Sequence, residues 1–70
     1  MIYKMDIEWE TKGDPTVAEC AQVVFLENNS GITKQQALDT AKEYLQLDDM
    51  KAYLHREVLT YRNLHHKHKM

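Results

Sequence analysis

The sequence predicts a small α+β domain that is mostly helical, with one N-terminal β-strand followed by two or three α-helices. Two patterns indicate this fold: apolar residues alternate with period two in residues 2–10, and they recur at helical spacing from residue 16 to residue 64. The chain has 70 residues, of which 43% are hydrophobic, and this supports one compact core. We therefore expect residues 1–70 to be a single domain, with residues 65–70 as a frayed basic and histidine-rich tail.

Residues 2–10 show the pattern of a half-buried β-strand with one wet face. The apolar positions are Tyr3, Met5, Ile7 and Trp9, and the charged positions between them are Lys4, Asp6, Glu8 and Glu10. Because a strand must pair its backbone N–H and C=O groups, it needs a partner. That partner is either a hairpin strand at residues 20–27 or the same strand in a second copy, which would make the protein a homodimer.

Residues 16–27 are compatible with either a helix or a strand, and the helix is favoured. Asp14 followed by Pro15 is a helix-start signal. One helical face then carries Val17, Cys20, Ala21, Val24 and Phe25, and the stretch ends at residues 28–31, where Asn and Gly are typical of a helix stop. The strand alternative rests on the high β propensity of residues 23–26.

Two further helices are indicated toward the C-terminus. Thr33 and Gln36 match a capping box, and apolar residues follow at helical spacing: Ala37, Leu38, Ala41, Tyr44 and Leu45. Asp48 and Asp49 are typical of the cap of a third helix over about residues 50–64. Its apolar stripe is Met50, Tyr53, Leu54, Val58 and Tyr61, with Leu59 and Leu64 beside it. Lys51, His55, Arg62 and His66 line the opposite side.

The residue inventory argues against catalysis, so we expect a protein that is not an enzyme and has no cofactor. Two glycines exclude a P-loop and a dinucleotide fingerprint, and a single cysteine excludes an intramolecular disulfide and a Cys-x-x-Cys zinc site. Cys20 lies on the apolar face of its helix, as a buried core cysteine would. The histidines at 65, 66 and 68 have no carboxylate or thiolate beside them, so we expect no metal site. One cysteine, no signal peptide and no long apolar stretch favour a cytoplasmic location without a membrane.

Charge is divided unevenly and indicates the kind of function. The net charge is −2, with −6 over the first fifty residues and +4 over the last twenty. We predict a protein-binding module, a small regulator or inhibitor of the phage or mobile-element type that acts on a host protein or complex. Its binding residues would lie on the acidic strand face, at Asp6, Glu8 and Glu10, or on the basic last helix, at Lys51, His55 and Arg62.

The order of a strand, a helix, a glycine-containing turn and a capped helix resembles ribbon–helix–helix proteins over about residues 2–46. The turn reads Gly31-Ile32-Thr33, and apolar residues follow at the family's spacing, namely Ala37, Leu38, Ala41 and Leu45. The resemblance implies the alternative function of a dimeric DNA-binding transcriptional regulator. Lys4, Asp6 and Glu8 would then enter the major groove, where two carboxylates would oppose binding to phosphates. The acidic strand face therefore disfavours nucleic acid as the partner.

Overall fold

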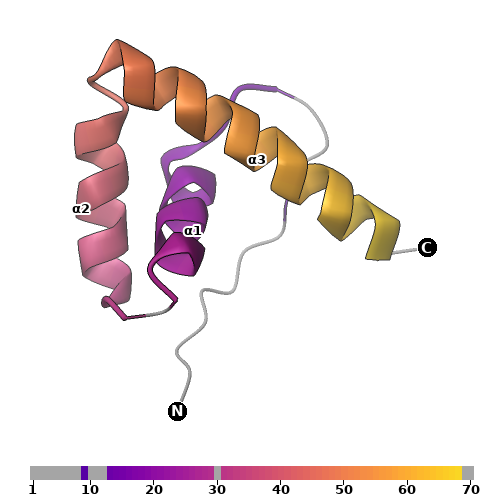
Figure 1. Ribbon diagram of the computed structural model, residues 1–70, viewed down its shortest axis with the longest axis horizontal. Helices are drawn as coiled ribbons and strands as arrows, with labels where there is room; N and C mark the ends of the chain where they lie inside the picture. The colour runs from indigo at the N-terminus through magenta and orange to yellow at the C-terminus, as the bar shows by residue number, and fades with distance from the viewer. Residues whose placement is uncertain (1–8, 10–12, 30, 69–70) are drawn as a thin grey trace.

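The computed structural model describes Trp9, residues 13–29 and residues 31–68, the last four of these as backbone only. The described residues form three helices: α1 (Val17–Glu27), α2 (Lys34–Tyr44) and α3 (Asp48–His68). α1 and α2 lie side by side, and α3 runs across α1 and extends beyond it toward the C-terminus (Figure 1). α1 packs against both other helices and is the central element of the fold.

The predicted α+β class is wrong, because the described part of the chain contains three helices and no strand. Residues 20–27 belong to α1, which removes the hairpin alternative. The remaining alternating residues lie outside the described part, and Trp9, the one that is described, is in neither a helix nor a strand. Burial explains the apolar residues at 23–25, because a helix covered on all sides is as continuously apolar as a buried strand, whereas Leu26 at the end of this run is 37% exposed.

Capping boxes start α1 and α2. The Glu19 backbone N–H donates to Thr16 Oγ1 (3.1 Å), and the Thr16 backbone N–H donates to Glu19 Oε1 (3.0 Å). The start predicted at Asp14 and Pro15 is therefore two residues early, because Thr16 is the N-cap and its side chain accepts a hydrogen bond from the Glu19 N–H in the first turn. The predicted capping box between Thr33 and Gln36 is confirmed by the same pair of hydrogen bonds at the start of α2.

The turn after α1 follows the predicted stop signal. Asn28 is the C-cap, and Asn29 adopts the left-handed conformation with φ of 53°. The Gly31 backbone N–H donates to the Asn28 carbonyl at 2.8 Å, and a Cβ at Gly31 would lie only 3.0 Å from that same oxygen. A glycine therefore lets the chain turn tightly from α1 into α2.

α3 is longer at both ends than the predicted span of residues 50–64. Asp48 and Asp49 form its first turn, where their charges interact favourably with the helix dipole. At the other end the helix continues to His68. That residues 65–70 are a frayed tail stays a prediction.

The core is built around seven consecutive buried residues of α1, from Glu19 to Phe25. Since successive helical residues are 100° apart, this run buries every side of the helix. α2 contributes Ala37 and Ala41, whose small side chains permit close packing, and α3 contributes Leu54 and Val58. Trp9 packs against this core and stacks on Tyr61 with ring centroids 6.0 Å apart.

Candidate functional site

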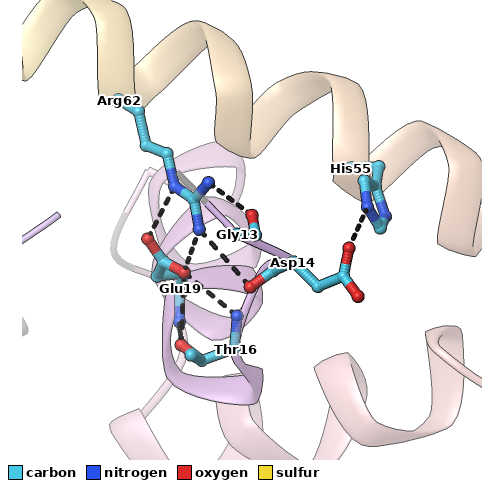
Figure 2. Close-up of polar contacts among 6 residues, drawn as sticks. All are labelled: Gly13, Asp14, Thr16, Glu19, His55 and Arg62. Carbon is cyan, nitrogen blue, oxygen red and sulfur yellow. Dashed lines mark hydrogen bonds and ion pairs between the residues drawn. The ribbon is translucent and has the colours of Figure 1, made fainter. Parts of the chain in front are cut away.

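A buried ion pair fixes α3 against the start of α1. Arg62 Nη2 donates to Glu19 Oε1 at 2.7 Å, and Arg62 Nε donates to Glu19 Oε2 at 3.0 Å. The two side chains are only 3% and 2% exposed. Arg62 Nη1 also donates to the Gly13 carbonyl at 2.8 Å, so the guanidinium binds the segment that leads into α1 as well (Figure 2). This bidentate geometry is the one in which arginine binds carboxylates most strongly.

The prediction that Arg62 belongs to a solvent-facing basic side of the last helix is wrong. Leu54, Val58 and Arg62 are spaced by four residues, so they share the side of α3 that faces α1. The capping box holds the Glu19 carboxylate at the position that the guanidinium reaches. Arg62 is therefore a residue that stabilises the fold, and it is not exposed to a partner.

Lys51 and His55, two other predicted binding residues, are four positions apart on α3 and therefore neighbours on its surface. Lys51 is exposed on α3. His55 lies nearer the edge of the helix, with its Nε2 atom 3.6 Å from Oδ1 of the fully exposed Asp14 side chain (Figure 2). The acidic residues Asp6, Glu8 and Glu10 lie outside the described residues, so their assignment stays a prediction.

The exposed residues of α3 between positions 51 and 64 are what we call the outer face, namely Lys51, Ala52, Arg56, Leu59, Thr60, Asn63 and Leu64. They do not all point away from α1, because Lys51 precedes the buried Val58 by seven residues, or about two turns, and so points to the same side of the helix as Val58. Leu59 is 48% exposed and Leu64 is 51% exposed, which places two large apolar side chains in solvent on one helix. This set contains two cations and no carboxylate. Sequence reasoning missed both leucines as surface residues, because it placed them beside the apolar stripe of the helix.

Two glutamates, Glu27 and Glu57, lie at the edge between α1 and α3 and partly balance the positive charge of the outer face. Tyr53 Oη donates to the Glu27 carboxylate, and Arg56 lies over the Tyr53 ring with Cζ 5.5 Å from the ring centroid. Arg56 Nε is also 3.7 Å from Glu57 Oε2, in a pair whose arginine is 69% exposed. Burial, followed by repulsion from Glu57, raises the pKa of Glu27 above its ordinary value. These contacts join α1 to α3 and orient Arg56 at the boundary of the outer face.

Cys20, the candidate metal ligands and the surface depressions of the described residues add no second candidate site. Cys20 is fully buried, as the sequence predicts, and burial raises the pKa of its thiol, which disfavours the reactive thiolate. Among the residues with described side chains, no group of three His, Cys, Asp or Glu residues is placed to hold a metal ion. Residues 46–50, at the turn between α2 and α3, line a shallow open depression. No helix in the described ranges combines the length and the apolar composition that a bilayer crossing requires.

Comparison with known proteins gives no relative: no family model, no curated protein and no solved structure matches this chain. The resemblance to ribbon–helix–helix proteins therefore stays a prediction.

Proposed function

We propose that this protein is a non-enzymatic protein-binding module that uses the outer face of α3 to bind an acidic surface on another protein. The observation that carries the proposal is the composition of that face between positions 51 and 64, where two half-exposed leucines lie among exposed basic and neutral side chains and the one carboxylate, Glu57, is partly buried. Exposed large apolar residues bordered by polar ones are typical of interaction sites. Occupying an acidic surface in this way would let a small domain act as a regulator or inhibitor.

The two kinds of side chain contribute different terms to binding. Covering the exposed half of a leucine contributes about 1 kcal/mol, which is half of the value for burying the whole side chain. Lys51 and Arg56 contribute mainly to the rate of association and to partner choice, because exposed charges steer an encounter more than they add affinity. Together these terms favour an acidic partner that also presents apolar side chains.

α3 is fixed before any partner arrives, which reduces the cost of binding. Leu54, Val58 and Arg62 attach its inner side to α1 over about two helical turns. A face held in place in this way loses little conformational entropy on association.

A pair of variants with matched substitutions tests the proposal. The face variant carries Lys51→Glu and Leu59→Ser, and the control variant carries Lys34→Glu and Leu47→Ser at exposed positions elsewhere. Partners are captured from an extract of the source cells, identified by mass spectrometry, purified and titrated by calorimetry. We expect the face variant to bind the partner at least tenfold more weakly and the control variant to bind within twofold of the original chain. Equal binding by the face variant, or no protein retained above the face variant's background, would contradict the proposal.

A further inference from the structure

The two halves of α3 are attached to the rest of the fold in different ways. Leu54 and Val58 are fully buried in the core, so apolar packing holds the first half of the helix. Beyond Val58, Arg62 is the only buried residue among the described side chains of α3. The second half of α3 is therefore held by the polar contacts of this arginine and by whatever packs on its neighbour, the half-buried Tyr61.

These contacts join three parts of the chain at one place. The Arg62 guanidinium binds the Glu19 carboxylate in the first turn of α1 and the Gly13 carbonyl before that helix (Figure 2). One residue earlier on α3, the Tyr61 ring stacks on Trp9, with ring centroids 6.0 Å apart. We call this set of contacts, among Trp9, Gly13, Glu19, Tyr61 and Arg62, the clasp.

We propose that the clasp opens as one unit, which releases the second half of α3 and the start of α1 together while the rest of the core stays folded. When Arg62 leaves, the Glu19 carboxylate loses its cation and turns to water, so it no longer holds the Thr16 backbone N–H of the capping box. The first turn of α1 therefore loses part of its cap in the same event in which α3 detaches. The two ends are coupled because one guanidinium holds both.

The chemistry of the clasp favours this local opening over unfolding of the whole domain. When the ion pair opens, both charges return to water, and their hydration compensates for much of the lost attraction. Separating Leu54 and Val58 from α1 exposes apolar surface instead, and no hydration of charge compensates for that loss. Regions with few buried apolar side chains are the ones that open most often in a native protein.

Two simpler behaviours predict different results. If the domain opens only as a whole, every well-protected backbone N–H reports the same global unfolding. If the start of α1 and the end of α3 fray separately, their N–H groups open with unrelated frequencies. The clasp predicts instead that these two ends, 43 residues apart at Glu19 and Arg62, share one opening equilibrium.

Native-state hydrogen exchange of the full chain distinguishes these behaviours with three reporter amides. The Cys20 N–H, which donates to the Thr16 carbonyl at 3.0 Å, reports the start of α1, and the Leu64 N–H reports the second half of α3. The Phe25 N–H, in the buried part of α1, reports unfolding of the core. Exchange is followed at several urea concentrations, under conditions where its rate gives the opening equilibrium. We expect Cys20 and Leu64 to open equally often, with the same urea dependence, and at least tenfold more often than Phe25.

Two variants separate the clasp from the core. Trp9→Leu removes the aromatic stack of the clasp, and Leu38→Ala truncates a side chain of α2 that packs against the core. Because Trp9 contacts the clasp only in its closed state, its loss should speed exchange of all three reporter amides by the same factor, at least threefold. The contacts of Leu38 persist when the clasp opens, so Leu38→Ala should speed exchange at Phe25 at least threefold and leave the other two reporters within twofold.

Three results would overturn the proposal. Equal acceleration of all three reporters by Leu38→Ala would mean that the domain opens only as a whole. A different urea dependence of Cys20 and Leu64 in the original chain, or acceleration of Leu64 alone by Trp9→Leu, would mean that the two ends open separately. Exchange of all three reporters within twofold of the original chain in Trp9→Leu would mean that the aromatic stack does not hold the clasp closed.

Discussion

α1 and α3 bury their side chains in opposite patterns. All seven residues of α1 from Glu19 to Phe25 are buried, whereas the fully buried residues in the described part of α3 are Leu54, Val58 and Arg62, at every fourth position. α1 is enclosed, so each of its polar groups must find a partner inside the protein. α3 is enclosed on one side only and leaves the other side to solvent.

The difference in burial between α1 and α3 separates the residues that stabilise the fold from those that are exposed to a partner. Glu19 of α1 is satisfied by Arg62, while Gln22 Oε1 is buried without a hydrogen-bond partner among the described residues. Burying these polar groups of α1 costs free energy, and Arg62 of α3 offsets part of this cost by pairing with Glu19. Substitutions on the inner side of α3 should strongly destabilise the folded protein, and those on its outer face should not.

The largest expected effect comes from breaking the buried ion pair. Arg62→Met leaves the Glu19 carboxylate buried without its cation, and we expect the free energy of unfolding to fall by about 3–5 kcal/mol. A domain of this size has only about 4–10 kcal/mol in total, so much of the stability is lost. Urea unfolding followed by circular dichroism measures the change.

Arg56→Met is the matched control, because it removes the same kind of charge from an exposed position of the same helix. We expect a change within about 0.5 kcal/mol for this control. The double variant Glu19→Met with Arg62→Met should recover much of the loss, because no charge stays buried. Equal stability of the two single arginine variants would show that the ion pair does not hold α3 to α1.

The same substitution at two leucines of α3 compares how much its inner side and its outer face contribute to stability. Leu54→Ala creates a cavity in the core and should cost about 2–5 kcal/mol. Leu59→Ala on the outer face should change the stability by less than about 0.5 kcal/mol. Thermal and urea unfolding of both variants give the two values, and a large loss with Leu59→Ala would mean that the outer face is covered in the folded protein.

The smallest expected effect on stability comes from Glu27, at the edge between α1 and α3. A raised pKa means that the folded protein holds the Glu27 proton more tightly than the unfolded chain does, so the ionised form opposes folding at neutral pH. Glu27→Gln keeps an acceptor for Tyr53 and should raise the free energy of unfolding by a few tenths of a kcal/mol at pH 7, since solvent screens an exposed group. The gain should vanish as the pH falls below the ordinary value of 4.5.

Glu43→Gln is the control for this pH dependence. Glu43 also lies in the last turn of its helix, so the substitution removes the same unfavourable interaction with the helix dipole. Urea unfolding from pH 4 to pH 7 should show a larger gain for Glu27→Gln than for Glu43→Gln as the pH rises, because burial and repulsion from Glu57 act on Glu27 in addition to the dipole. The same pH dependence in both variants would assign the effect to the helix dipole.

Local signals in the sequence predicted much of the helical structure. The capping box at Thr33 and Gln36, the Asn and Gly residues after α1 and the buried Cys20 all depend on neighbours within a few turns. The start of α1 was also readable, because Thr16 and Glu19 form the same Thr-x-x-Glu signal, although Asp14 and Pro15 drew the prediction to an earlier position. These features are local, so sequence spacing is sufficient to find them.

The amino-acid sequence by itself determined where helices begin and end to within a few residues, and that this chain has one core. Only the tertiary structure decided that residues 20–27 form a central helix, because a continuous apolar run fits both a buried helix and a buried strand. It also decided that Arg62 lies inside and Leu59 outside. Arg62 and Glu19 are 43 residues apart, and no periodicity within one helix reveals a partner on another. The rotation of α3 about its own axis is set by that contact, and it selects the side chains that are left on the outer face.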